Sequence, residues 1–284
     1  MKRLAKRILR GLGYEVRRIG SLRAEPPAWV EVTPDFRHTE RMANRAYRPP
    51  HVPYERMPRG GDVRVKYLLY FLDLRDLRVL ELGPRDGHQS IMLEKLGARE
   101  VVAVEGRREN LEQCLRTKER YALDRTTFHL ADVEALAEGR LTPPFQGTFD
   151  LVYCTGLLYH LQKPAHVLGW CRQQAPTLFL QTHYVEEAAA DRYRRPGFHE
   201  TTYRHGEHEY RAKAFEEEAG NPRAGLRATS IWFYERDLLT AIERAGFERV
   251  SVLGKDVHAS LPHITVLADS FSGFLAARPR LRRR

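Results

Sequence analysis

Short apolar, β-rich runs alternate with helical patterns along most of this chain, and this alternation constrains the fold more than any other feature. Strands that alternate with helices of this length form βαβ units, in which helices cover both faces of a largely parallel sheet. The helical patterns lie at 88–97, 108–122, 164–174 and 235–246. The β-rich runs lie at 78–82, 100–105, 126–130, 149–154, 177–182, 248–254 and 262–268.

The last two runs are separated only by a loop, GKDVHASL, so we expect them to be antiparallel neighbours. Together with the five alternating units before them, they predict an α/β fold. It is a Rossmann-like, seven-stranded mixed sheet with helices on both faces.

Two regions do not follow the alternation. Residues 24–60 are rich in Pro and Arg and predict an extended wrap that completes an N-terminal extension over 1–60. Residues 184–228, between the fifth and sixth strands, are too many for a plain connection. We expect them to form a cap over the carboxyl ends of the strands, where open α/β sheets bind ligands. The core then comprises 61–183 and 229–275, and an Arg-rich tail follows at 276–284.

The net charge of +10 is concentrated at the two ends of the chain. Residues 1–23 carry a net +7 and residues 276–284 carry five arginines, so the body between them carries about −2. A body without excess positive charge makes nucleic acid a less favoured partner. The three cysteines, Cys114, Cys154 and Cys171, are too few and too scattered for a disulfide framework. No stretch approaches the ~20 apolar residues of a membrane helix, so we expect a reduced, cytoplasmic setting.

The N-terminal stretch MKRLAKRILRGLGYEVRRIG places Leu4, Ile8 and Leu12 on one face of a helix, with basic residues around it. Such a basic amphipathic helix over residues 1–20 can bind an anionic membrane surface or an acidic partner. It can equally dock on the main domain with its charges in solvent, and both interpretations stay open.

The stretch VLELGPRDGHQS at 79–90 has the outline of a nucleotide-binding turn, but it lacks the middle glycine of a dinucleotide fingerprint. Arg85 and Asp86 occupy the turn instead, and Glu81 ends the strand before it. Two carboxylates repel a pyrophosphate but suit a cofactor that carries an ammonium and a sulfonium. Gly83 and Gly87 still permit a tight turn against a nucleoside. The turn therefore indicates a cationic nucleoside such as S-adenosylmethionine.

Acidic residues also follow the next two strands. Glu105 closes VVAVEG, 22 residues after Gly83, where an acidic side chain can bind both hydroxyls of a ribose. Asp132 follows the third strand, where it can accept from an adenine amine while Val133 lies against the ring. Because a strand-end Asp also commonly caps the next helix, a capping role for Asp132 stays open.

In order and spacing, VLELGPRDG, VVAVEG, LADVEA and FDLVYCTGLLYHLQKP resemble the cofactor-binding motifs of class I S-adenosylmethionine-dependent methyltransferases, over about residues 77–268. Within that superfamily the chain is similar to a branch of tRNA wobble-uridine modifying enzymes and of methyltransferases of glycans and small molecules. The resemblance implies S-adenosylmethionine as the cofactor and methyl transfer by in-line displacement. The cofactor-binding residues predicted on this basis are Glu81, Gly83, Arg85, Gly87, Ser90, Glu105, Gly106, Asp132, Val133, Thr155, Gly156 and Leu157. Arg85 departs from the small residues usual in this turn, and pairing with the cofactor carboxylate is one role for it.

Two histidines follow strands at the edge where an acceptor must meet the cofactor. His160 follows the fourth strand in LLYHLQ, and His183 follows the fifth in LQTHYV. Either can remove the proton of an acceptor hydroxyl near neutral pH. In the alternative, structural interpretation, the pair Tyr159 and His160 holds the loop, and Tyr159 packs under the cofactor.

The cap segment HETTYRHGEHEY is rich in His and Tyr, which can stack on sugar or ring faces while their polar tips form hydrogen bonds. The predicted acceptor contacts are Tyr159, Tyr184, His199, Tyr203, His205, His208 and Trp232. Trp232 suits the core as well as an acceptor pocket. The cap histidines with Glu200 and Glu207 are an alternative divalent-metal site, but no regular element in the sequence fixes them, so no metal is predicted.

The sequence thus predicts an enzyme that methylates a hydroxyl of a glycan or small molecule, with S-adenosylmethionine as cofactor and a histidine base. The second candidate is a tRNA wobble-uridine methyl- or carboxymethyltransferase, for which the two Arg-rich ends would have to form one basic patch. A non-catalytic cofactor-binding or scaffold protein is the third, and the three acidic strand ends argue against it.

Overall fold

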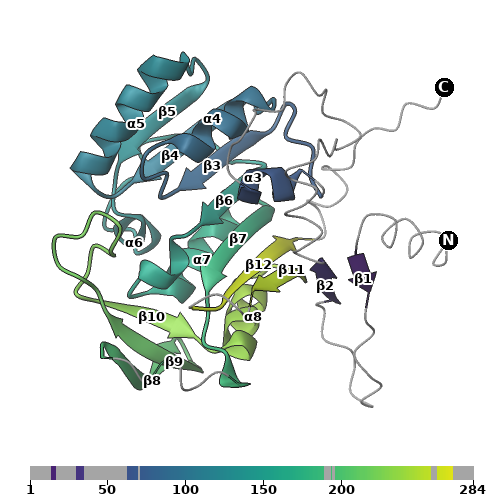
Figure 1. Ribbon diagram of the computed structural model, residues 1–284, viewed down its shortest axis with the longest axis vertical. Coiled ribbons are helices and arrows are strands. Elements are labelled where there is room, and N and C mark those ends of the chain that lie inside the picture. The colour runs from purple at the N-terminus through teal and green to yellow at the C-terminus, as the bar shows by residue number, and fades with distance from the viewer. Residues whose placement is uncertain are drawn as a thin grey trace.

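The computed structural model describes residues 14–16, 30–34, 63–69, 71–188, 193, 196–256 and 261–270 (Figure 1). The predicted Arg-rich tail and most of the predicted basic helix lie outside these residues. Within the stretch predicted to be helical, Tyr14–Val16 forms strand β1, so that helix does not extend through these residues.

The main sheet has the predicted mixed architecture. Its strand order is β1-β2-β11-β12-β7-β6-β3-β4-β5. The seven predicted strands are all present, and β2 extends the sheet by pairing parallel to β11 while β1 pairs antiparallel to β2. As expected, β11 and β12 are antiparallel. The strands are β1 (Tyr14–Val16), β2 (Val30–Pro34), β3 (Arg78–Leu82), β4 (Glu100–Glu105), β5 (Thr126–Leu130), β6 (Leu151–Thr155), β7 (Thr177–His183), β11 (Arg249–Asp256) and β12 (His263–Asp269).

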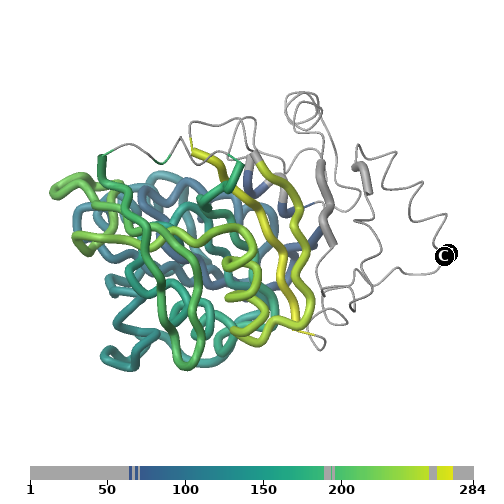
Figure 2. Tube along the Cα trace, turned by 90° about the horizontal axis from the view of Figure 1, so that it is seen from below, coloured from purple at the N-terminus to yellow at the C-terminus, as the bar shows by residue number. Residues whose placement is uncertain are grey.

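Helices cover both faces of this sheet because its central strands are apolar on both sides. On one face Leu80, Val152 and Leu178 pack under α6 (Val133–Ala137), α7 (Pro164–Gln174) and α8 (Glu235–Arg244). On the other face Val79 and Tyr153 pack under α3 (Val63–Leu68) and α4 (His88–Lys95), and α5 (Arg108–Tyr121) covers β4 and β5. Figure 2 shows the body from below, with β11 and β12 side by side along one flank.

The predicted cap is a second, smaller sheet. It consists of β8 (Phe198–His205), β9 (His208–Glu216) and β10 (Thr229–Phe233), in the order β10-β9-β8 and antiparallel throughout. The two-residue turn at Gly206 and Glu207 joins β8 to β9, and Gly206 has the positive φ of 59° that such hairpin turns favour. Because β10 pairs with β9, the cap extends to Phe233, five residues beyond the predicted boundary at 228.

The cap is attached to the main sheet next to β6. Its β10 packs on the 3₁₀ helix η2 (Leu158–His160), and the Ile231 amide donates to the Leu161 carbonyl at 2.8 Å. The segment between β9 and β10, residues 217–228, then crosses the carboxyl edge of the main sheet. We call residues 217–227 the cap loop.

Candidate cofactor and acceptor site

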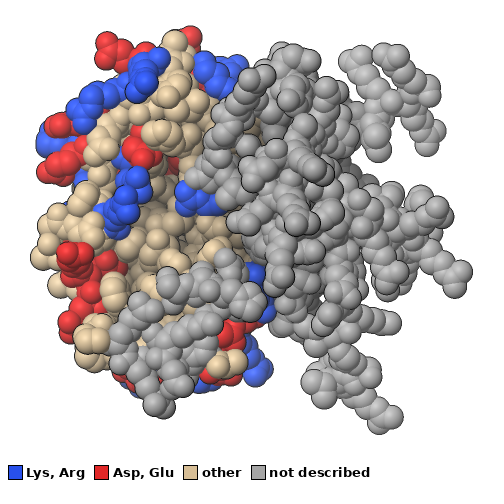
Figure 3. All heavy atoms as spheres, in the orientation of Figure 1, with Lys and Arg blue, Asp and Glu red and all other residues tan. Residues whose placement is uncertain are grey.

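A cavity of about 570 Å³ lies between the carboxyl edge of the main sheet and the cap loop. The turns after β3, β4, β5 and β6 form its floor, and residues 215–226 of the cap form its roof. This is where open α/β sheets bind ligands, and the volume suits a small organic cofactor. Figure 3 shows this face, with Lys, Arg, Asp and Glu side chains gathered around its hollowed part.

The turn after β3 has the close backbone approach that its glycines predict. Gly83 and Gly87 have φ of 69° and 77°, and a Cβ at Gly87 would lie 3.2–3.3 Å from Thr117 and Phe128. Arg85 also has a positive φ, 56°, which is uncommon for a non-glycine residue. Its amide donates to Glu105 Oε2 at 3.1 Å, and this bond holds the turn. Gly83 and Arg85 line the cavity.

Three of the predicted cofactor residues lie behind this turn instead of on the cavity wall. Glu81 is 1% exposed and sits on the face covered by α4, where the Ser90 hydroxyl donates to its carboxylate. Ser90 is fully buried, and Gly87 packs on α5. Glu81, Ser90 and Gly87 therefore support the turn from beneath and do not line the cavity.

Glu105 joins two turns at the cavity wall. Its carboxylate accepts the Arg85 amide at 3.1 Å, the Arg107 amide at 2.9 Å and the Asn110 side-chain amide at 3.4 Å. A carboxylate offers about four acceptor positions, so Glu105 retains capacity for a ligand hydroxyl. Its neighbour Gly106 also lines the cavity.

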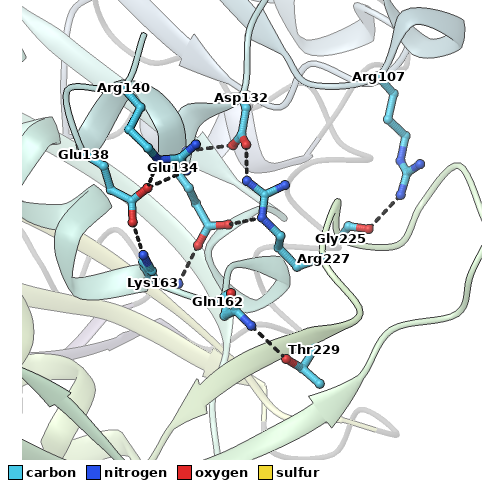
Figure 4. Close-up of polar contacts among 10 residues, drawn as sticks. All are labelled: Arg107, Asp132, Glu134, Glu138, Arg140, Gln162, Lys163, Gly225, Arg227 and Thr229. Atoms are coloured by element: carbon cyan, nitrogen blue, oxygen red, sulfur yellow. Dashed lines mark hydrogen bonds and ion pairs between the residues drawn. The ribbon is translucent and has the colours of Figure 1, made fainter.

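Asp132 has the capping role that the sequence left open, and its second oxygen contacts the cap loop. Its Oδ1 accepts the Glu134 amide at 2.9 Å and so caps α6, whereas Oδ2 pairs with Arg227 of the cap loop. Arg227 also lies 3.9 Å from Glu134, whose buried carboxyl has a raised pKa, mainly because of desolvation. Figure 4 shows Arg227 between these two carboxylates. Asp132 and Val133 both line the cavity.

The loop after β6 lines the opposite end of the cavity. The Thr155 hydroxyl donates to Gln89 Oε1 at 2.7 Å, and Gly156 has a positive φ of 79°. Leu157, Tyr159 and His160 continue this wall, and Arg64 of α3 lines the cavity near Gly156.

His160 is held by a carboxylate from the cap. Its Nδ1 lies 2.9 Å from Glu217 Oε1 and 3.1 Å from Oε2, and the Gly225 amide donates to Oε2 at 2.8 Å. Burial alone would raise the pKa of Glu217, but its contacts with His160 and the Gly225 amide outweigh burial and lower that pKa. An ionised carboxylate only accepts hydrogen bonds, so Nδ1 of His160 carries a proton, and in the neutral ring Nε2 is the basic nitrogen.

His183 lies behind Tyr159 and does not line the cavity. Its ring stacks on Trp232, with centroids 5.1 Å apart and planes at 6°, and Tyr159 packs edge-on against it at 4.4 Å. Its Nδ1 donates to the Pro262 carbonyl at 3.0 Å, and burial lowers its pKa. The ring is thus part of an aromatic layer that supports Tyr159.

The predicted acceptor contacts Tyr184 and Trp232 are core residues. Tyr184 is fully buried, its hydroxyl donates to Glu186 at 2.7 Å, and burial raises its pKa. Trp232 is 3% exposed and packs among Tyr159, Phe198 and Phe215. Of the seven predicted acceptor contacts, Tyr159 alone lines the cavity.

The cap residues predicted to contact the acceptor are spread along the β8–β9 hairpin, away from the cavity. His199 pairs with Glu216 at 3.1 Å in solvent, whereas Tyr203 and His205 pack on His166 of α7. From His199 to His205 a strand rises about 20 Å, so the cap histidines do not converge on one point. His208 is exposed at the turn. Within the described part of the chain, no three His, Cys, Asp or Glu side chains are grouped to hold a metal ion.

Several residues of the site have no motif in the sequence. Arg107 donates to the carbonyls of Ala224 and Gly225 at 3.1 and 2.7 Å, and Asn110 donates to the Pro222 carbonyl at 3.1 Å. Together with the contacts of Glu217 and Arg227 described above, these hydrogen bonds pin the cap loop over the cavity. The only sequence signal was the Gly-, Asn- and Pro-rich composition of residues 220–225, which is typical of any loop.

Comparison with known proteins agrees with this geometry. A family model described as a methyltransferase domain matches residues 55–252. The N-terminal domain of EvdMO1, solved in the presence of SAH and D-fucose, is 25% identical with a TM-score of 0.60, over 84% of this chain and 98% of that one. Magnesium protoporphyrin IX methyltransferase (ChlM) from Synechocystis PCC 6803, solved with bound SAH, shares the fold at 16% identity and a TM-score of 0.50, over 73% and 80% of the two chains.

A curated relative, tRNA U34 carboxymethyltransferase from Campylobacter hominis, is 26% identical over 120 residues. That match covers 41% of this chain and 39% of the relative, so it spans well under half of either protein. The family model, by contrast, spans more than half of the chain and includes every turn of the cavity floor. The chain therefore belongs to the methyltransferase-domain family, and it is a class I S-adenosylmethionine-dependent methyltransferase.

Proposed function

We propose that this enzyme methylates a hydroxyl group of a glycan or small molecule, with His160 as the base. The observation that carries the proposal is the state of His160: it lies on the cavity wall with Nδ1 bound to Glu217, which leaves Nε2 as the basic nitrogen. A hydroxyl acceptor needs such a base, because it must lose a proton as it is methylated. The EvdMO1 domain, solved in the presence of SAH and D-fucose, supports a sugar hydroxyl among the candidate acceptors.

The residues around the cavity fit S-adenosylmethionine. Glu105, with its remaining acceptor capacity, would hold the ribose, and Asp132 and Val133 would face the adenine. Glycines on two sides, Gly83 and Gly156, allow the cofactor to approach the backbone closely. Arg85 or Arg64 would pair with the carboxylate of the methionine portion. When bound, the cofactor supplies a methyl group on a sulfonium, which is already a good electrophile.

The chain's own contribution is then to orient the acceptor and accept its proton. Nε2 of His160 would take the proton of the acceptor hydroxyl, and Tyr159 would form the floor beside it. General-base assistance raises a rate by about 10²–10⁴-fold. Loss of His160 should therefore lower turnover by more than the loss of acceptor positioning alone would. His183, which lies behind Tyr159, would act on the acceptor only through that ring.

The proposal is tested by supplying radiolabelled S-adenosylmethionine to the enzyme with extracted glycans, small-molecule extracts and total tRNA, each with and without ribonuclease. Label in a ribonuclease-resistant hydroxyl acceptor is expected. His160→Gln should lower turnover by about 10²-fold or more while SAH (S-adenosylhomocysteine) binds as before. His208→Gln, at the exposed hairpin turn, is the control and should change neither. SAH binding with label confined to RNA would overturn the choice of acceptor.

A tRNA-modifying activity is the second candidate, and the local match to the Campylobacter hominis carboxymethyltransferase favours it. The many arginines at both ends of the chain would supply phosphate contacts. Binding to tRNA should then weaken steeply as salt increases, because counterions are released for each phosphate contacted. Tight tRNA binding with that salt slope, together with label in the tRNA, would favour this candidate over the first.

The basic N-terminal stretch is proposed to bind an anionic membrane surface or an acidic partner from the cytoplasmic side. Among the described residues, none of the helices combines the length and apolar character needed to cross a bilayer. Removal of residues 1–12 should abolish sedimentation with anionic vesicles and leave SAH binding unchanged. Equal sedimentation of the full and shortened chains would contradict a membrane role.

A further inference from the structure

The proposed base, His160, contacts a carboxylate of the cap, that of Glu217, which is 57 positions away in the sequence. The Glu217 side chain is 3% exposed, and the His160 side chain is 19% exposed. Glu217 follows the last residue of β9, and its amide donates to the Ala228 carbonyl at 2.9 Å, so both ends of the cap loop meet at this residue.

We infer that Glu217 is a positioning residue for His160: it fixes the imidazole in the tautomer whose Nε2 can accept the acceptor's proton. The inference rests on the proposed function of His160 as the base. It adds that Glu217 keeps His160 in the tautomer that this function requires. It also gives the cap a role in the chemical step.

The two oxygens of Glu217 are not equivalent, because only one of them also accepts a backbone amide, and this difference makes the inference testable. Oε2 accepts the Gly225 amide at 2.8 Å, and Oε1 is the oxygen nearer to Nδ1 of His160, at 2.9 Å. In Glu217→Gln the amide oxygen must remain opposite the Gly225 amide, because an NH₂ group there would face a donor. The NH₂ group then faces His160 and donates to Nδ1, so the ring proton moves to Nε2. The variant keeps its shape but presents the wrong nitrogen.

The cap loop restricts Glu217 from the other side as well. A Cβ at Gly225 would lie 2.4 Å from the His160 carbonyl oxygen, so the two backbones are in direct contact there. Arg107 holds the Gly225 carbonyl at 2.7 Å from the side of α5, as Figure 4 shows. The Gly225 backbone is therefore held in place, and with it the amide that fixes one oxygen of Glu217 beside the His160 ring.

The test uses the full chain with ¹⁵N-labelled histidine and SAH as the probe. Signals of His160 are assigned by their loss in His160→Gln. In the wild type, Nδ1 should resonate as a protonated ring nitrogen and Nε2 as an unprotonated one at neutral pH, with and without SAH. In Glu217→Gln the two nitrogens should exchange these roles, whereas Glu217→Asp should restore the wild-type tautomer at least in part.

Glu216→Gln is the matched control, because Glu216 also pairs with a histidine, His199, but does so in solvent outside the cavity. It should leave the His160 signals and SAH affinity unchanged. Once an acceptor is in hand, Glu217→Gln should lower kcat by about 10²-fold or more, with little change in KM for the cofactor.

The possible outcomes separate this inference from the function on which it depends. If the wild type does not bind SAH, the proposed function fails. If Glu217→Gln binds SAH and melts like the wild type but keeps Nδ1 protonated, the inference fails and the function survives. Should the variant not fold, Glu217→Asp decides: a wild-type tautomer supports the positioning role, and a reversed tautomer overturns it.

Discussion

Replacement of Glu105 by Gln should weaken cofactor binding and stability together, and the structure allows both effects to be estimated. Each oxygen of Glu105 accepts one backbone amide, from Arg85 and from Arg107. A Gln side chain has one acceptor oxygen, so in either orientation one of these amides faces an NH₂ group. A buried donor without an acceptor destabilises the fold by about 1–3 kcal/mol.

The cofactor loses a further interaction in the same variant. A hydrogen bond from a ribose hydroxyl to a carboxylate contributes about 1.5–3 kcal/mol, of which a neutral amide retains only part. A net loss of about 2 kcal/mol corresponds to an SAH affinity roughly 30-fold weaker. At 100 times the wild-type Kd, SAH stabilises the wild type by about 2.7 kcal/mol but the variant by only about 0.9 kcal/mol. For a chain of this size, SAH should raise the melting temperature of the wild type by about 5 °C and that of the variant by about 2 °C.

Glu94 provides a matched control for this measurement. It is equally buried, and its two oxygens accept the Asp124 and Arg125 amides at 3.1 and 3.2 Å, but it does not line the cavity. Glu94→Gln should therefore lower the melting temperature as Glu105→Gln does, while calorimetry gives an unchanged Kd for SAH. Equal SAH affinity in Glu105→Gln and the wild type would refute the assignment of Glu105 to the ribose.

Three further changes probe the cap loop and the buried histidines. Arg227→Gln removes the cation that pairs with Asp132, so SAH should dissociate faster and trypsin should cut sooner after Arg223 of the cap loop. Arg204 is exposed on the hairpin, and Arg204→Gln should change neither the dissociation of SAH nor the cleavage. Gly225→Ala forces a Cβ to within 2.4 Å of the His160 carbonyl, so the melting temperature should fall by an amount equivalent to about 1–3 kcal/mol, and an unchanged value would show that this contact can relax. Burial lowers the pKa of His183 in the folded chain, so as the pH falls below 6.5 the unfolded chain takes up a proton at this residue before the folded chain does. This difference in proton uptake lowers the free energy of unfolding below pH 6.5 and has no effect above it. The fall in melting temperature between pH 7.5 and 5.5 should thus be smaller in His183→Gln, and an identical fall would contradict this.

The main sheet was predictable because each of its strands carries its own local signal. Apolar runs such as RVLEL and EVVAVE read as buried strands, and the intervening helices fix their parallel order. The two additional strands were not predicted, because Val30–Pro34 lies in a Pro- and Arg-rich stretch and joins the sheet only by pairing with β11 at its edge. The strands of the cap sheet were not predicted either, although alternating residues flank a two-residue turn at Gly206, a pattern typical of a hairpin.

The site was predictable where topology alone brings residues together. Glu105 and Thr155 end parallel strands, Asp132 and His160 follow such strands, and the carboxyl ends of parallel strands meet at one edge. Positions off that edge were predicted less well, since Glu81 points into the layer beneath α4 and His183 lies behind Tyr159. Partners such as Glu217 were missed because a contact across 57 residues depends on the path of the cap, which no local pattern encodes.

The order of contacts along the cap loop follows the order of strands in the sheet. Glu217 meets His160 after β6, Gly225 meets Arg107 after β4, and Arg227 meets Asp132 after β5. In the sheet order β7-β6-β3-β4-β5, β5 is four strands from β7, or about 19 Å at the usual spacing. The chain leaves the main sheet at β7, so a short connection would not reach Asp132. A hairpin that folds back and continues as a loop along the strand ends does reach Asp132. This path explains why a single insertion can hold the base through Glu217 at one end of the cap loop and cover the nucleoside through Arg227 at the other.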